Sequence, residues 1–280
     1  MNCKIVADSS CDISTLDGVC FSSVPLKIIT DTAEYIDDSR LDVFKMAEEL
    51  KAYKGISRSS CPNAQEYKVA FDDGDCDAIF CITITGELSG SYNAARIAMN
   101  EFTEEHPDRK CKIINSLSVG PESALIILKL KELIAANKSF DEISSEIDDY
   151  VKSTRLIFCL ESLNNLAHNG RVSNAVAKIA GLLGIRIIGR ASDEGCLELI
   201  GKARGKDKAL ADIMHHMQRD GYCGGGVRIH HCFNTDAANE LKTMILSRYA
   251  DAKIEIAPVG GLCSFYAESG GLLVGFETNI

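Results

Sequence analysis

The segment most informative about architecture is Asp77-Ala78-Ile79-Phe80-Cys81-Ile82-Thr83-Ile84-Thr85-Gly86-Glu87-Leu88-Ser89-Gly90-Ser91. Its first part is almost continuously apolar, which is typical of a strand buried on both faces. A polar, glycine-containing turn follows, and a helix is expected from Tyr92 to about Phe102. Strand, turn and helix in this order form the repeating unit of a parallel α/β sheet.

The same unit recurs on both sides of this segment. Lys4–Ala7 is a short apolar run that ends in a polar turn, and Val24–Ile29 is a further strand candidate. Cys111–Ile114 is another apolar run, followed by a long helix from about Glu122 to Ala136. This alternation predicts a Rossmann-like parallel sheet covered by helices in the first half of the chain.

The second half has a different arrangement of elements. Two strands are expected to form a hairpin around Asp193-Glu194-Gly195, and two others flank a helix, so the pattern indicates a second α/β domain with a mixed or antiparallel sheet. We expect the boundary near Ser153, with domains at 1–153 and 154–280. The expected elements are the helices Phe140–Ser153, Asn174–Leu183 and Thr235–Tyr249 and the strands Leu156–Leu160, Arg186–Arg190, Cys196–Lys202, Val227–His231 and Ile254–Pro258.

Composition limits the classes of function. The 280 residues carry a formal net charge of -10 and no cluster of lysine or arginine, which argues against nucleic-acid binding. The longest apolar stretch, near 175–188, contains Lys178 and Arg186 and is too short to span a bilayer. With no signal-peptide pattern at the start, we expect a cytoplasmic protein that is not inserted in a membrane.

Cysteine and histidine patterns do not predict a metal site. The twelve cysteines are scattered singly without a CxxC pair, so we interpret them as reduced thiols. The histidines form no HExxH motif. No nucleotide-binding glycine motif is present, and we expect neither a metal nor a cofactor.

Three hydroxyl-rich turns are the best candidates for a binding site. They are Asp8-Ser9-Ser10, Arg58-Ser59-Ser60 and Leu88-Ser89-Gly90-Ser91. Ligands of open parallel sheets bind beyond the carboxyl ends of the strands, and free N–H groups at helix starts favour anions. The turns therefore suit a carboxylate or a phosphate, although serines in such turns are often ordinary helix caps.

Six segments resemble the DegV family in order and spacing over essentially the whole chain. They are Asp8-Ser9-Ser10-Cys11-Asp12, Arg58-Ser59-Ser60-Cys61-Pro62, Leu88-Ser89-Gly90-Ser91-Tyr92-Asn93-Ala94-Ala95, Asn169-Gly170-Arg171-Val172, Ala203-Arg204-Gly205-Lys206 and Gly270-Gly271-Leu272-Leu273-Val274-Gly275-Phe276. The resemblance implies a long-chain fatty acid such as palmitate, stearate or oleate at the junction of two domains. It also implies a fatty acid kinase as a partner, because some members carry the acyl group to such an enzyme.

The resemblance also implies roles for individual residues. Ser59, Ser89 and Gly90 match the positions that hold the carboxylate, while Ser60, Arg171 and Tyr266 are expected near the head group or the partner. One departure concerns the kinase. Kinase-associated carriers often have a histidine in a Thr-His-Thr-Gly segment near the C-terminus, and Tyr266 is the residue nearest to it here.

Two alternatives stay open at this point. Five apolar residues are candidates for the acyl-chain lining, but they could equally pack a helix onto the second sheet: Ala177, Ala180, Leu182, Leu183 and Ile185. The competing class of function is an acyl- or phosphoryl-transfer enzyme that uses Ser89 and Arg171. A general base beside the serine is not evident, and Gly86-Glu87-Leu88-Ser89-Gly90 has its serine one place too late for a hydrolase elbow.

Overall fold

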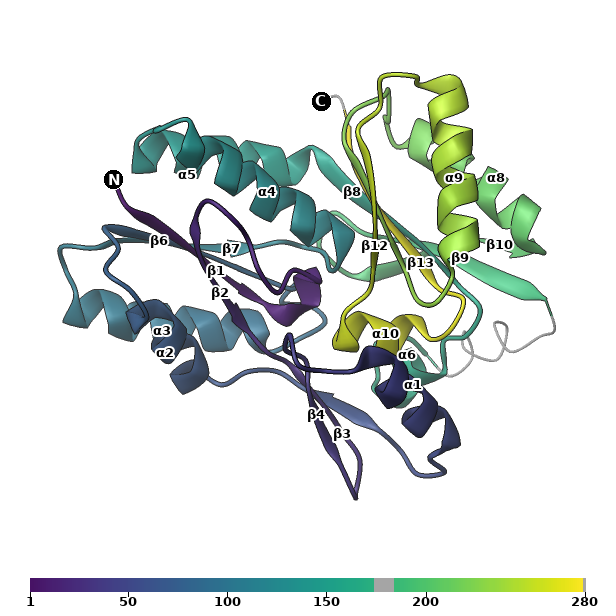
Figure 1. Ribbon diagram of the computed structural model, residues 1–280, viewed down its shortest axis with the longest axis horizontal. Coiled ribbons are helices and arrows are strands. Elements are labelled where there is room, and N and C mark those ends of the chain that lie inside the picture. Colours follow the sequence, from purple (N-terminus) through teal and green to yellow (C-terminus); the bar gives the residue numbers. More distant parts are fainter. Residues whose placement is uncertain (174–183, 279–280) are drawn as a thin grey trace.

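A computed structural model describes residues 1–173 and 184–278 (Figure 1). Its N-terminal half is built on a four-stranded parallel sheet. In sheet order the strands are β2 (Cys20–Val24), β1 (Cys3–Asp8), β6 (Ala78–Thr83) and β7 (Lys110–Asn115). This arrangement confirms the parallel α/β architecture expected from the sequence.

Helices cover both faces of this sheet (Figure 1). The first pair is α2 (Ala64–Asp72) and α3 (Ser91–Glu105), and the second is α4 (Pro121–Ala135) and α5 (Phe140–Lys152). Ile79 and Cys81 of β6 pack with the first pair, while Phe80 and Ile82 pack with the second. Successive side chains of a strand point to opposite faces, so an apolar run is what a strand between two helical layers requires.

A small three-stranded sheet corrects two expectations. It consists of β4 (Glu34–Ile36), β3 (Lys27–Ile29) and β5 (Arg58–Ser60) in that order, beside the helix α1 (Val43–Ala52). The single strand expected at Val24–Ile29 was wrong, because Pro25 lies between β2 and β3, which belong to different sheets. Proline cannot donate to a sheet ladder, so it separates them.

The second correction concerns the serine-rich segment at 58–60. It was expected as a turn but forms β5, which pairs with β3 in antiparallel register, with Ser59 opposite Ile28 and Ser60 opposite Lys27. Because neighbouring side chains of a strand point to opposite faces, Ser59 and Ser60 cannot face the same space. Only one of these two hydroxyls can serve a common site.

The C-terminal half contains a six-stranded mixed sheet, as expected. Only β11 (Val227–His231) and β12 (Ile254–Pro258) pair in parallel, and the other neighbouring strands are antiparallel. The helices α8 (Lys206–Arg219) and α9 (Thr235–Arg248) lie on one face, and the short helix α6 (Asn164–His168) follows β8. In sheet order the strands are β10 (Leu197–Arg204), β9 (Ile185–Ala191), β8 (Thr154–Leu160), β13 (Leu272–Glu277), β11 (Val227–His231) and β12 (Ile254–Pro258).

The hairpin expected around Asp193-Glu194-Gly195 is confirmed by the antiparallel pair β9 and β10. The helix expected at 174–183 lies outside the described residues. The first strand of the six-stranded sheet begins at Thr154, while the division into domains at 153/154 stays a prediction. Within the described part of the chain, no helix is both long enough and apolar enough to cross a membrane.

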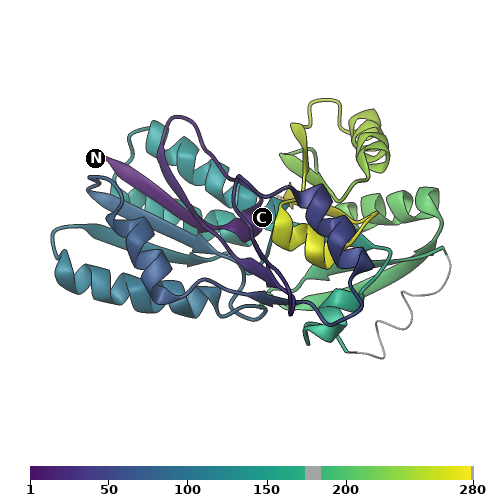
Figure 2. The same cartoon turned by 60° about the horizontal axis from the view of Figure 1, so that its bottom comes forward.

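A helix after Ile254–Pro258 was not expected from the sequence. It is α10 (Gly261–Ala267), which connects β12 to β13 in the C-terminal half. Figure 2 shows it beside α1 of the N-terminal half, and it also contacts β3 and the short 3-10 helix η1 (Ser9–Cys11) there. Because α10 joins one half of the chain by sequence and the other by packing, it bridges the two halves.

Candidate functional site

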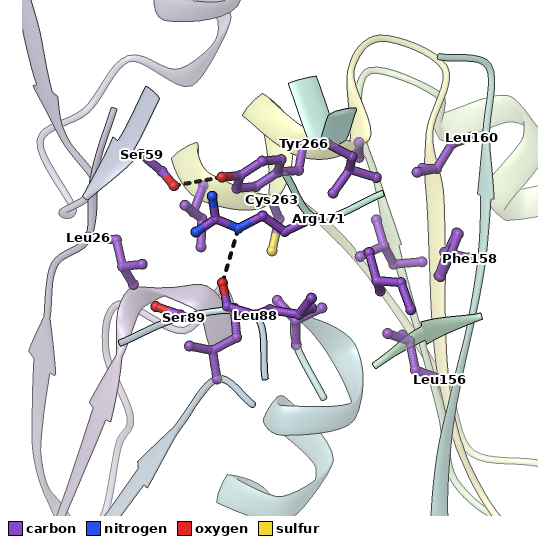
Figure 3. Close-up of a pocket in the computed structure, with 17 residues that line it drawn as sticks. Leu26, Ser59, Leu88, Ser89, Leu156, Phe158, Leu160, Arg171, Cys263 and Tyr266 are labelled. Atoms are coloured by element: carbon purple, nitrogen blue, oxygen red, sulfur yellow. Dashed lines mark hydrogen bonds between the residues drawn. The ribbon is translucent and has the colours of Figure 1, made fainter. Parts of the chain in front are cut away.

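A pocket lies where the two halves meet. Leu156, Phe158 and Leu160 line it from β8, opposite residues of the N-terminal half (Figure 3). The hollow measures about 690 Å³ when the open space at its mouth is included. The remaining lining residues are Leu26, Ser59, Ile84, Leu88, Ser89, Val119, Leu166, Arg171, Leu197, Leu262, Cys263, Tyr266, Ala267 and Leu273.

The apolar wall follows from strand geometry. Leu156, Phe158 and Leu160 alternate along β8 with Ile157 and Cys159, which belong to the core under α8 and α9. The Phe158 ring lies across Gly189 of β9, where an added Cβ would come within 2.1 Å of Phe158 Cζ. A glycine at this point therefore leaves room for the ring in the wall.

Polar groups gather at one end of the pocket. The hydroxyls of Ser59 and Tyr266 are 2.6 Å apart, and Ser89 lies on the neighbouring loop (Figure 3). Arg171 Nε donates to the Leu88 carbonyl at 3.1 Å, and its guanidinium carbon lies 5.9 Å from the centre of the Tyr266 ring. The pocket thus has one end rich in donors, while most of the rest of its lining is apolar.

Tyr266 keeps its proton at neutral pH. Burial raises the pKa of its hydroxyl, although the bond with Ser59 and the charge of Arg171 act in the opposite direction. A protonated phenol beside a serine hydroxyl can donate to an anion, and so can the guanidinium of Arg171. This end of the pocket therefore matches a carboxylate.

A buried carboxylate supports the loop that carries Ser89. Asp8 Oδ2 accepts from Ile84 N at 3.0 Å and from Ser91 Oγ at 2.6 Å, which are the two ends of that loop. Ser10 Oγ donates to the other oxygen of Asp8 at 2.5 Å. The hydroxyls of the first serine-rich turn are thus committed to internal bonds, and neither Ser9 nor Ser10 lines the pocket.

Comparison with known proteins agrees with this architecture. The family model described as "Uncharacterised protein, DegV family" matches residues 2–279. A DegV domain-containing protein of Streptococcus pyogenes serotype M1 is 42% identical over 281 residues, covering 99% of this chain and 100% of the relative.

The chain belongs to the DegV family.

Two solved structures are similar to this chain over their whole length. A DegV family protein from Eubacterium eligens, loaded with heptadecanoic acid, is 44% identical with a TM-score of 0.96 and covers 99% of this chain and 100% of its own. The Streptococcus pneumoniae Fatty Acid Kinase (Fak) B3 protein, loaded with linoleic acid, is 41% identical with a TM-score of 0.97 and complete coverage of both chains.

Most of the expected head-group residues of this DegV protein line one pocket. Ser59, Ser89, Arg171 and Tyr266 come together although they lie on four separate segments. Ser60 points elsewhere, and its hydroxyl donates to the Cys61 carbonyl at 3.4 Å. Contact between a ligand and the four residues that line the pocket stays a prediction.

Gly90 is the N-cap residue that precedes α3, and it does not line the pocket in this structure. An added Cβ there would lie 3.2 Å from Cys61 Sγ, which indicates a close approach between the Ser89 loop and the segment after β5. Among the expected chain-lining residues, Ile185 packs on the edge of the cluster that contains Phe158. The other four, Ala177, Ala180, Leu182 and Leu183, lie outside the described residues.

Sequence reasoning missed the apolar wall on β8. Its run Leu156–Leu160 was predicted as a strand, but both faces are apolar, so nothing in the pattern distinguishes the pocket face from the core face. The contribution of α10 was missed because its seven residues are too few for a helical period to stand out. Alternation along β8 is the one signal that could have named Leu156, Phe158 and Leu160 as a set.

The described polar contacts do not activate Ser89 as a nucleophile. Its hydroxyl accepts from Ser91 N at 3.3 Å, and among the described residues it has no hydrogen bond to a histidine or a carboxylate. Nor do the described residues contain a group of three His, Cys, Asp or Glu side chains able to hold a metal ion. The pocket lining combines hydrogen-bond donors with an apolar wall, an arrangement that suits an amphipathic anion.

Proposed function

We propose that this DegV protein binds one long-chain fatty acid in the pocket between its halves. The observation that carries the proposal is the division of the pocket into a donor end and an extended apolar wall. Each methylene removed from water contributes about 0.8 kcal/mol, so a long chain supplies most of the affinity. Palmitate, stearate and oleate fit this chemistry, as do the ligands of the two similar structures.

We place the carboxylate at Ser59, Ser89 and Tyr266. An unpaired charge in an apolar pocket is strongly disfavoured, whereas each hydrogen bond to a charged group contributes roughly 1.5–3 kcal/mol. In this proposal the Gly90 N–H adds a further donor when the ligand is bound. Arg171 lies at the same end, where in this proposal it faces the partner and is not needed to hold the carboxylate.

The protein's role in this proposal is that of a carrier for a kinase. The chain has no nucleotide-binding motif, so ATP would come from a partner that phosphorylates the carboxylate. The relationship to the pneumococcal Fatty Acid Kinase (Fak) B3 protein supports such a partner. Acyl transfer by Ser89 itself has less support, because no base contacts the hydroxyl among the described residues.

Native mass spectrometry of the purified protein tests lipid binding. We expect a bound mass of fatty-acid size, and after delipidation a stoichiometry of one with oleate. Oleyl alcohol is the matched ligand, because it has the same chain without the charge, and it should bind at least tenfold more weakly if one charged bond is lost. Equal affinities would show that the donor end does not hold the carboxylate.

The kinase role needs a separate assay. The protein, a fatty acid kinase of the same organism, ATP and oleate should together produce acyl phosphate, and omission of either protein should abolish the product. If lipid binds but no such kinase yields product, the carrier role fails while the binding proposal stands. Turnover of acyl esters by delipidated protein would instead support the transferase alternative.

A further inference from the structure

The helix α10 forms part of the pocket wall, yet it docks on the opposite half of the chain. Leu262, Cys263 and Tyr266 line the pocket from α10. On its other side Phe265 packs against Ile28 and Met46, which belong to β3 and α1. The position of Tyr266 relative to Ser59 therefore depends on how α10 sits on the N-terminal half.

Two buried carboxylates of the N-terminal half hold the start of α10. Asp37 Oδ1 accepts from Gly261 N at 2.6 Å, and Asp37 Oδ2 accepts from Leu262 N at 3.0 Å. Asp12 Oδ1 accepts from Gly260 N at 2.8 Å. We name Asp12 and Asp37 the carboxylate clamp. The first N–H groups of a helix lack partners within it and favour negative charge, so the clamp satisfies three such donors.

The clamp is itself fixed from two directions. Ser9 Oγ donates to Asp37 Oδ2 at 2.8 Å and accepts from Leu26 N at 3.0 Å. Asp12 Oδ2 lies 2.7 Å from Nδ1 of His230 on β11, and both of these side chains are buried. Burial raises the pKa of Asp37 to about 6, which leaves it largely ionised at neutral pH. The turn that follows β1 is thus linked both to the start of α10 and to β11.

We propose that Asp37 is a positioning residue for fatty-acid binding, acting through α10 to bring the Tyr266 hydroxyl to the carboxylate. This inference rests on the proposed function. Asp37 does not line the pocket, so it has no direct contact to offer a ligand there. Tyr266 lies five residues beyond Gly261, which is about 7.5 Å along the helix. If the first turn of α10 shifts, Tyr266 moves with it, because the helix is short and its backbone hydrogen bonds hold its turns together. The 2.6 Å contact with Ser59 tolerates little displacement.

A double-mutant cycle on oleate affinity distinguishes this role from a general loss of stability. Asp37→Asn replaces two acceptors by one acceptor and a donor that opposes an N–H group. We expect it to weaken oleate binding about tenfold, the loss of one charged hydrogen bond at the head group. In the Tyr266→Phe background the same change should have no further effect, because the hydroxyl that Asp37 positions is already absent. If the double variant instead loses oleate affinity by the product of the two single-variant factors, the two residues act independently and the proposal is wrong.

The control is Ser139→Ala, which removes the N-cap of α5 far from the pocket and should lower stability without changing oleate affinity. If Asp37→Asn does not fold, Ser9→Ala replaces it in the cycle, because this change removes one hydrogen-bond donor to Asp37. We expect Ser9→Ala to cause a smaller loss of oleate affinity, and no loss in the Tyr266→Phe background. Failure of the wild-type protein to bind oleate would refute the proposed function. Wild-type binding with unchanged affinity in Asp37→Asn would refute only the positioning role.

Discussion

Glu122 provides a quantitative test of the burial at the junction of the two halves. It lies in the first turn of α4 with 5% of its surface exposed, and Thr154 Oγ1 of β8 donates to its Oε1 at 2.9 Å. Burial raises the pKa of Glu122 from an ordinary 4.5 to about 7, although the hydroxyls of Ser118 and Thr154 favour the ionised form. The folded protein therefore holds this proton across a pH range in which the unfolded chain releases it.

The sign and size of the effect follow from proton linkage. Below pH 4.5 both states hold the proton and Glu122 has no effect on the pH dependence of stability. As the pH rises from 4.5 to about 7, the free energy of unfolding falls by about 1.4 kcal/mol per pH unit. Above pH 7 the loss is complete, at about 3 kcal/mol.

The variant Glu122→Gln keeps an acceptor for Thr154 but cannot ionise. We expect it to match the wild-type protein near pH 4.5 and to be about 3 kcal/mol more stable above pH 7. Urea denaturation followed by circular dichroism over this range measures the difference, with an unchanged dependence on urea as a check on two-state unfolding.

Glu142→Gln is the matched control for this experiment. Glu142 completes an exposed capping box at the start of α5, where hydrogen bonds from Ser139 lower its pKa. Its contribution to stability is present above the ordinary pKa and is lost as the pH falls, which is the opposite trend. A stability difference between Glu122→Gln and wild type that does not change with pH would refute the assignment of a buried, protonated carboxyl group.

Three further predictions concern the pocket. Ser89→Ala should leave the circular dichroism spectrum unchanged and weaken oleate binding in calorimetry about tenfold; unchanged affinity would place the head group elsewhere. Phe158→Ala should weaken oleate and oleyl alcohol by the same factor, since the lost contact is apolar; a loss for oleate alone would contradict its place on the chain wall. Arg171→Ala should retain oleate but reduce acyl-phosphate formation with a kinase, and equal rates of product formation would remove it from the partner surface.

The positions of elements followed closely from local patterns. The helix predicted at Thr235–Tyr249 is α9 (Thr235–Arg248), and the apolar run before Thr85 proved to be the strand β6 between two helical layers. Both signals depend on residues close in the chain, namely a cap, a turn and the period of apolar side chains. The split of Val24–Ile29 between two sheets was missed, because sheet membership depends on pairing partners far away in sequence.

The serine-rich turns also show what local patterns predict and what depends on contacts between distant segments. Their residue types pointed to an anion, and the resemblance to the DegV family pointed to Ser59 and Ser89 among them. The structure assigns different tasks to the turns, since Ser59 and Ser89 line the pocket while Ser9 supports Asp37. Nothing local distinguishes these tasks, because each hydroxyl finds its partner only after distant segments pack together.

Local patterns predicted most of the strands and helices, and six short motifs predicted the family to which the chain belongs. Which face of β8 lines the pocket and which helix bridges the halves depended on how distant segments pack. The physical reason is that apolar runs and hydroxyl-rich loops satisfy many packings equally well. Contacts such as that of Ser59 with Tyr266, or Asp37 with Gly261, join residues about two hundred positions apart. Such contacts form only when the whole chain has folded.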